Sequence, residues 1–172
     1  MEITVWPPGH LQWLGKRVRC ALGRGGVRAD KREGDGATPA GSFPLRRVMY
    51  RADRLAAPET ALPVRALGHD DGWCDDPEHP AYNRPVTAPF AARHERLWRD
   101  DALYDVVVEL GFNDDPVEVG RGSAIFLHRA RPGYGPTEGC VTLALEDLLA
   151  LLGDCDGDTT LTVRLTAPAG RN

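Results

Sequence analysis

The chain lacks the features that mark several classes of protein. None of its apolar runs approaches the roughly 18 residues that a membrane-spanning helix needs, and residues 1–10 lack the charged start and apolar middle of a signal peptide. Its 21 Lys and Arg are outnumbered by 25 Asp and Glu, for a net charge of −4. We therefore expect no membrane span, no visible export signal and no nucleic acid as a partner, because nucleic-acid binders need a strongly basic face.

Cysteine is also scarce. The four cysteines include no CxxC pair and are too few for a disulfide framework in a chain of 172 residues. The sequence predicts no cofactor and no resident metal, and no prediction of the oligomeric state follows from it.

What remains is a composition ordinary for a globular protein, with 42% hydrophobic and 27% charged residues. The length suits one domain over residues 1–172. Alternating or β-branched runs bounded by turn residues predict a mainly β protein. The expected strands cover residues 2–6, 17–22, 43–50, 62–67, 103–110, 124–128 and 159–165.

One or two short helices are expected among these strands. Within residues 143–153 an apolar face repeats at helical spacing, before a C-terminal stop at Gly153, and its members are Leu145, Leu148, Leu149 and Leu152. A second helix is predicted over residues 93–99. The loops at 23–41 and 68–92 are longer than a connection requires, which is typical of functional loops.

One stretch combines the parts of a cysteine nucleophile. Such a site needs a base within hydrogen-bond reach and backbone N–H groups aimed at the oxyanion. In "IFLHRARPGYGPTEGCVTL", residues 125–143, His128 ends an apolar run and Cys140 follows Gly139, which lets the chain turn tightly. A nearby helix start and an imidazolium would lower the thiol pKa. The alternative is that Cys140 is a small buried hydrophobe and His128 is held by a backbone partner.

The same stretch resembles the signature of the L,D-transpeptidase catalytic domain (YkuD-type) family, which reads His, a variable loop, Ser or Thr, usually His, then Gly, Cys and an aliphatic residue. The matching residues are His128, Thr137, Gly139, Cys140 and Val141. Upstream, "GDGATPAGSFPL" is similar to the family's Gly-x-Thr-Pro-x-Gly-x-Phe segment, and "GSAIFLH" to the strand before its histidine. The resemblance runs through most of the chain and implies a β-sandwich of mixed sheets.

Three departures from the family pattern bear on specificity. Glu138 stands where many members carry a second histidine, Thr142 stands where Arg or Asn is usual, and the loop from His128 to Cys140 is short. With the "DDPEHPAYNRP" loop, these features resemble a proteobacterial branch that joins L-Ala at stem position 1 to diaminopimelate at position 3.

The resemblance implies a peptidoglycan L,D-transpeptidase that acts on stem peptides (muropeptides) by cysteine acyl transfer. Cys140 would be the nucleophile and His128 the general base and acid, while the N–H groups of Gly139 and Cys140 would bind the oxyanion. Thr137 and Glu138 would shape the turn or touch substrate. The implied location is periplasmic, and a cytoplasmic role is the alternative because no export signal is visible.

Stem peptides carry a carboxylate and an amine, so the long loops should present matching donors and acceptors. Six candidates for substrate binding are Arg24, Asp71, Trp73, Tyr82, Asn83 and Asn113. Each has a structural alternative, which is core packing for the aromatic residues and a solvated turn for the Asp-rich neighbours.

Other functions fit the sequence less well. His69, Cys74 and His79 are evenly spaced but lack the tight pairing of zinc ligands, and "DCDGD" lacks the glutamate that completes an EF-hand loop. Within the family, two alternatives stay open: an L,D-carboxypeptidase or endopeptidase that trims stem peptides, and a catalytically idle peptidoglycan-binding protein.

Overall fold

The computed structural model describes residues 1–168, in which strands dominate. The strands are β1 (Glu2–Trp6), β2 (His10–Trp13), β3 (Lys16–Arg19), β4 (Val27–Arg28), β5 (Thr38–Pro39), β6 (Gly41–Tyr50), β7 (Val64–Ala66), β8 (Asp71–Cys74), β9 (Pro85–Thr87), β10 (His94–Arg96), β11 (Val106–Leu110), β12 (Phe126–Arg129), β13 (Val141–Leu143) and β14 (Thr160–Val163). One α-helix, α1 (Leu145–Asp154), and a 3-10 turn, η1 (Pro132–Tyr134), accompany them. The prediction of a mainly β protein with mixed sheets is confirmed.

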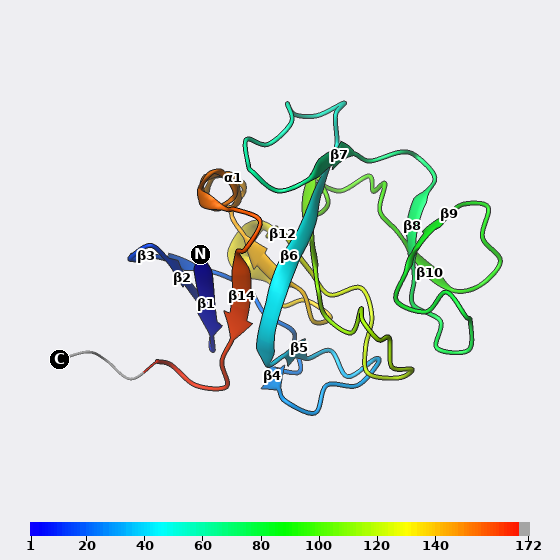
Figure 1. The fold of residues 1–172 in the computed structure, drawn as a ribbon, viewed down its shortest axis with the longest axis horizontal. Helices are drawn as coiled ribbons and strands as arrows, with labels where there is room; N and C mark the ends of the chain where they lie inside the picture. The colour runs from blue at the N-terminus through cyan, green and yellow to red at the C-terminus, as the bar shows by residue number, and fades with distance from the viewer. Residues whose placement is uncertain (169–172) are drawn as a thin grey trace.

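The main sheet has nine strands, and its longest strand, β6, belongs to both of its halves. Its strand order is β13-β12-β11-β6-β14-β1-β2-β3, and β7 pairs with β6 off this path. The first part of β6, residues 41–44, pairs with β14, and the rest pairs with β11. In Figure 1, β14 and β1 lie to the left of β6. A single ten-residue strand therefore belongs to both halves of the sandwich.

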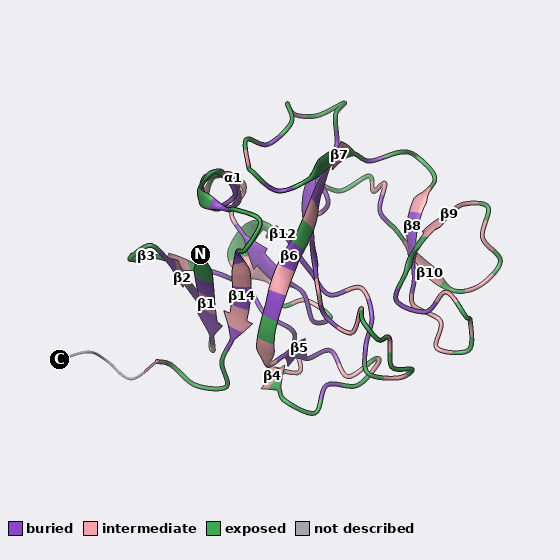
Figure 2. Ribbon diagram, in the orientation of Figure 1, coloured by how far each residue is buried: buried purple, intermediate pink, exposed green. Residues whose placement is uncertain are grey.

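A β-bridge joins the two ends of this strand order. Ala21, just after β3, and Thr142, in β13, exchange a pair of N–H···O bonds of 3.0 Å each. Both halves contribute to one core, which includes Ile3 and Leu161 from one half and Val108 and Leu127 from the other, all 0% exposed. The buried segments line the inside of both halves in Figure 2. The bridge brings the chain after β3 alongside the segment that contains Cys140.

The predicted helix over residues 143–153 is confirmed, with shifted ends. It begins at Leu145 because Leu143 is the last residue of β13, where it pairs with Arg129 of β12. It continues through Gly153 to Asp154, so the glycine is not its stop. The buried face consists of Leu148, Leu151 and Leu152. None of the helices within residues 1–168 has the length and apolar character needed to cross a membrane.

The prediction of a second helix over residues 93–99 is wrong. His94–Arg96 forms β10, which pairs with β8 in a small antiparallel sheet ordered β10-β8-β9, at the right of Figure 1. Leu97, the residue after this strand, is fully buried. Backbone pairing with a distant segment, which a local pattern does not contain, therefore decides the conformation.

Each of the seven predicted strands corresponds to an observed one, in order β1, β3, β6, β7, β11, β12 and β14. The strands that the sequence did not predict have two to four residues each. They include β10 and β13, which contribute Glu95 and Thr142 to the lining of the candidate site.

Candidate functional site

Cys140 and His128 lie on one face of the main sheet. β12 and β13 run parallel, with His128 opposite Thr142 and Leu127 opposite Val141. Side chains alternate along a strand, so Leu127 and Val141 enter the main core while the two reactive residues face the other side. There Cys140 packs in a second buried cluster, which also contains Phe126, Trp73 and Tyr104.

A cavity of about 300 Å³ opens on this face. Cys140, His128 and Thr137 line it together with residues from three other segments. These further lining residues include Lys31, Glu33, Glu95, Arg99, Tyr104 and Arg131. The nucleophile and the base predicted from the sequence therefore share one cavity.

His128 is held in one tautomer by backbone carbonyls. Its Nδ1 lies 2.9 Å from the carbonyl oxygen of Arg129 and 3.2 Å from that of Leu103. A carbonyl only accepts hydrogen bonds, so Nδ1 carries the proton and Nε2 is left as the acceptor. Burial lowers the pKa of His128 to about 4, although these two hydrogen bonds oppose the shift. The imidazole is neutral near pH 7, as a general base must be.

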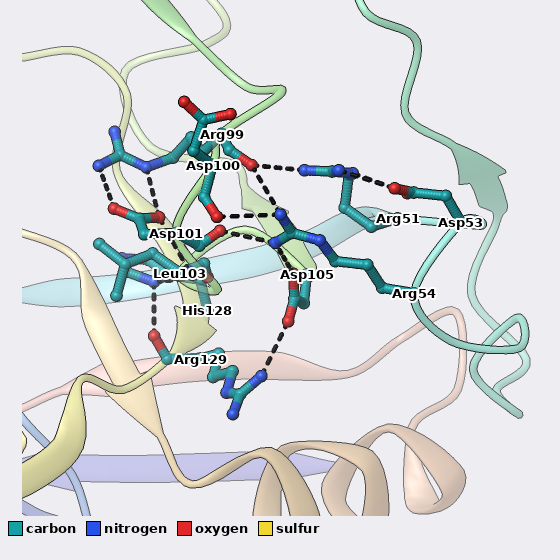
Figure 3. A network of polar contacts seen from close by, with 10 residues as sticks. All are labelled: Arg51, Asp53, Arg54, Arg99, Asp100, Asp101, Leu103, Asp105, His128 and Arg129. Carbon is teal, nitrogen blue, oxygen red and sulfur yellow. Dashed lines mark hydrogen bonds and ion pairs between the residues drawn. The ribbon is translucent and has the colours of Figure 1, made fainter.

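A network of arginines holds the loop that supplies Leu103 (Figure 3). Arg54 donates to the carbonyls of Asp100 (2.9 Å) and Asp101 (2.8 Å), and it pairs with the Asp105 carboxylate at 2.7 Å. The other oxygen of Asp105 accepts from Arg129 at 2.8 Å. Asp105 thus links the loop to the residue that follows His128.

Cys140 rests as a buried thiol. Its Sγ donates to the carbonyl of Ala124 at 3.3 Å and accepts from the N–H of Phe126 at 3.4 Å. Burial, and next the negative charge of Glu95, raise the pKa of the thiol to about 12. The predicted lowering of this pKa is wrong for the resting protein. The imidazole is neutral, and the helix begins beyond β13, a strand whose three residues span about 10 Å.

The turn before Cys140 is fixed by a hydroxyl and by a glycine. Thr137 Oγ1 accepts from the N–H of Gly139 at 3.1 Å and donates to the carbonyl of Cys140 at 2.7 Å. Gly139 has a φ of +142°, and a Cβ there would lie 2.8 Å from the carbonyl oxygen of Ala37 and 2.9 Å from Cδ1 of Ile125. The glycine is therefore required for both its conformation and its close contacts.

The "GDGATPAG" segment is packed against this same turn. The backbone of Thr137 bonds to Leu22 and Arg24, with N···O distances of 3.0 and 2.8 Å, and the N–H of Gly23 donates to Thr38 Oγ1 at 2.8 Å. Arg24 also pairs with Glu138, at 2.9 Å, on the exposed rim. The two stretches that carry the family resemblance thus meet in space, far apart in sequence.

The remaining substrate-binding candidates lie elsewhere. Asp71 pairs with Arg65 at 2.7 Å, and Trp73 Nε1 donates to Asn83 Oδ1 at 2.9 Å within the core. Tyr82 is buried, and its hydroxyl donates to the Glu33 carboxylate. None of these residues lines the cavity that holds Cys140.

Asn83 and Asn113 organise backbone. The Asn83 amide donates to the carbonyls of Phe112 and Asn113, at 3.1 and 2.8 Å. Asn113 closes the loop after it, because its amide donates to the carbonyls of Glu118 and Gly122 at 2.9 Å each. Of the eight predicted substrate-binding residues, the structure brings only Thr137 and Glu138 into the cavity with Cys140.

Two cavity residues that the sequence did not indicate lie next to the reactive pair. The ring of Tyr104 packs edge-on against the His128 imidazole, with centroids 4.9 Å apart, and its hydroxyl donates to Glu95. Glu95 lies in β10, within the stretch predicted to be a helix. Nothing in the sequence around Glu95 indicates that it lines a cavity. Its position becomes visible only in the sheet that β10 forms with β8.

The residues of the alternative metal site are separate from one another. His69 stacks on Trp98 with a centroid distance of 3.9 Å, and His79 packs against Phe90 at 4.9 Å. Cys74 is 0% exposed. Across residues 1–168, no group of three His, Cys, Asp or Glu side chains is placed to hold a metal ion.

Comparison with known proteins agrees with the motif residues. Two crystal structures of the helical cell shape determining protein Pgp2 from Campylobacter jejuni, the second a K307A mutant, are similar to the chain, at 14% and 13% identity and TM-scores of 0.49. Each similarity covers 97% of this chain, which spans about half the length of those proteins, 48% and 47%. No curated protein sequence matches the chain. The family model described as the L,D-transpeptidase catalytic domain (YkuD) matches residues 3–163, and the chain, with Cys140 and His128 in one cavity, belongs to this family.

Proposed function

We propose that this protein is an active L,D-transpeptidase that cross-links peptidoglycan stem peptides through a thioester at Cys140. The observation that carries the proposal is the cavity in which the Cys140 thiol and the His128 imidazole lie together, with Nδ1 held by carbonyls and Nε2 left to accept a proton. Family membership supports the same chemistry. The location that fits such a substrate is the periplasm.

The first step would be attack of the Cys140 sulfur on the carbonyl carbon of the L,D bond. With both groups neutral at rest, the thiol proton passes to His128 Nε2 as the carbon–sulfur bond forms. His128 then gives this proton to the departing amine, and a thioester remains. The thiol must first turn from the carbonyl of Ala124, its partner at rest.

The negative charge on the substrate oxygen needs donors near the sulfur. The N–H of Cys140 is adjacent to the nucleophile, and the N–H of Gly139 would join it by turning from Thr137 Oγ1. One such donor contributes roughly 2.7–4 kcal/mol in well-studied enzymes. Thr137 would still hold the turn through its bond to the Cys140 carbonyl while the N–H of Gly139 turns to the substrate oxygen.

In the second step an amine of another stem would take the acyl group. The resemblance to the proteobacterial branch, which includes the short loop from His128 to Cys140 and Glu138, supports a link from L-Ala at position 1 to diaminopimelate at position 3. Water in place of the amine would give the trimming reaction of a carboxypeptidase or endopeptidase.

The test is incubation of the protein with purified diaminopimelate-containing muropeptides, followed by mass spectrometry of products and protein. Dimers and an acyl group on Cys140 are expected, and fragmentation locates the new bond. Cys140→Ala should form neither. Cys20→Ala is a matched control, because it also removes a buried thiol, 3% exposed, but outside the cavity. Shortened monomers alone would contradict cross-linking, and an unmodified Cys140 would contradict the whole proposal.

A further inference from the structure

The cavity contains a carboxylate beside the reactive pair. Glu95 comes from β10, and Tyr104 connects it to His128, since its hydroxyl donates to Glu95 Oε1 and its ring packs on the imidazole. The charge of Glu95 is close enough to Cys140 to be, after burial, the second cause that raises the pKa of the thiol. Glu95 is thus a neighbour of both reacting side chains.

Glu95 has no cation of its own. Arg99, which lines the same cavity, is occupied by a two-bonded pair with Asp101, with distances of 2.9 and 2.6 Å. No salt bridge within residues 1–168 includes Glu95, and its Oε2 accepts no hydrogen bond from these residues. Removing a carboxylate from water without a cation is costly, and burial accordingly raises the pKa of Glu95.

An incoming cation would compensate this cost. The carboxylate is held in place, because Oε1 accepts from the Tyr104 hydroxyl and β10 is anchored by its pairing with β8. Three cations, Lys31, Arg99 and Arg131, also line the cavity. Lys31 pairs with Asp35 and Arg99 with Asp101, each at 2.6 Å, and none of the three forms a salt bridge with Glu95.

We propose that Glu95 binds the ammonium group of the acceptor amine and places it beside the thioester at Cys140. The inference rests on the proposed function, and it gives the acceptor a defined chemistry, that of an aliphatic ammonium. Glu95 is on this account a binding residue for the second substrate only. Donor binding and thioester formation do not require it.

The transfer step balances with His128 as the proton carrier. The bound ammonium releases one proton to solvent through the open cavity. The amine nitrogen then attacks the thioester carbon, its carbon–nitrogen bond forms, and the carbon–sulfur bond breaks. The second amine proton passes to His128 Nε2 and on to the departing Cys140 sulfur, so the thiol is restored.

The test is Glu95→Gln, which keeps the size and the oxygen that Tyr104 bonds but removes the charge. Diaminopimelate-containing muropeptides serve as donor and acceptor, and mass spectrometry follows the acyl group on Cys140, the dimers and the hydrolysed monomers. We expect acylation no slower than in the wild type, because the charge of Glu95 raises the pKa of the Cys140 thiol. The ratio of dimer to hydrolysed product should fall about tenfold or more, with a raised KM for the acceptor. Tyr104→Phe should lower the ratio by less, since it only loosens the carboxylate.

Glu59→Gln is the control for charge, because Glu59 is exposed in a loop and does not line the cavity. An unchanged ratio in Glu95→Gln, or an acylation rate that falls as much as dimer formation, overturns the inference alone. A wild-type protein that is acylated but yields only hydrolysed product overturns the amine site and cross-linking together. A wild-type protein that carries no acyl group on Cys140 shows instead that the proposed function is wrong, and the inference falls with it.

Discussion

At the scale of single residues, the site keeps a base neutral by burying it. His128 is 4% exposed, and burial lowers its pKa to about 4, below the value near 6.5 of an exposed histidine. The same burial keeps Cys140 a thiol, so reactivity depends on a proton transfer between two neutral groups. The structural contacts expected under the alternative interpretation, a buried cysteine and a backbone-bonded histidine, are present and are compatible with the catalytic one.

The low pKa of His128 predicts acid sensitivity. In the unfolded chain the imidazole binds a proton as the pH falls through about 6.5, whereas in the folded protein it does so only near 4, so the free energy of unfolding should fall between these values. The loss should reach about 3 kcal/mol at most. Urea unfolding from pH 7 to 4 measures it, and His128→Gln should flatten the curve; an equal slope in this variant would assign the effect to other groups.

Gly139 predicts a local steric effect. Gly139→Ala should cost about 1–3 kcal/mol in the free energy of unfolding and abolish acylation, since the new Cβ meets the carbonyl of Ala37 at a strained φ. Gly157→Ala is the matched control, because a Cβ there meets nothing within 4 Å. Thermal unfolding and acyl-enzyme mass measure the two effects, and equal behaviour of both variants would contradict the close contact.

At the scale of elements, the loop after β10 orients His128 in β12. Its carbonyls at positions 99–101 are held by Arg51 and Arg54, and its Leu103 carbonyl reaches His128. Asp105 ties this arrangement to Arg129, and the carboxylate itself is 8% exposed. The orientation of the base thus depends on contacts among the turn after β6, the loop before β11 and Arg129 of β12. Within residues 1–168, no acidic residue bonds to the imidazole.

Asp105→Asn should therefore weaken both stability and the positioning of His128. Because two half-exposed arginines lose a charged partner, we expect a loss of about 1–3 kcal/mol in the free energy of unfolding and a lower acylation kcat with little change in donor KM. Glu118→Gln, which breaks the exposed pair with Arg121, should change stability by less than about 0.5 kcal/mol. A wild-type kcat in Asp105→Asn would show that this network does not position His128 for catalysis.

At the scale of the whole molecule, the bridge between Ala21 and Thr142 joins the ends of the main sheet next to the site. It holds the segment of Leu22 and Arg24 beside Thr137, so the turn before Cys140 is braced by backbone hydrogen bonds. The rigidity of the site is therefore a property of the joined sandwich and not of the turn by itself.

This arrangement predicts slow amide hydrogen exchange at Ala21 and Thr142. Both amides should exchange only on global unfolding, as amides of a central sheet do, whereas exposed amides near Val119 should exchange by local opening. Exchange measured by NMR at increasing urea distinguishes the two regimes. Fast exchange of Ala21 and Thr142 in the native protein would show that the bridge opens independently of the sandwich.

The sequence by itself determined the class of fold, the seven predicted strands, the helix α1 and the motif that contains His128 and Cys140. Alternation over five or more residues is a local property, and His128, Gly139 and Cys140 stand in a motif whose spacing is written along the chain. These features can be recognised without knowing which distant segments they contact in the fold.

Only the tertiary structure decided which residues surround Cys140 and how they are charged. β10 became a strand by pairing with β8, and this pairing placed Glu95 in the cavity, while Trp73, Tyr82 and Asn83 went to the core. The pKa of the Cys140 thiol is raised, opposite to expectation, and His128 is a neutral imidazole where an imidazolium was expected, because burial outweighs any single neighbour in the sequence.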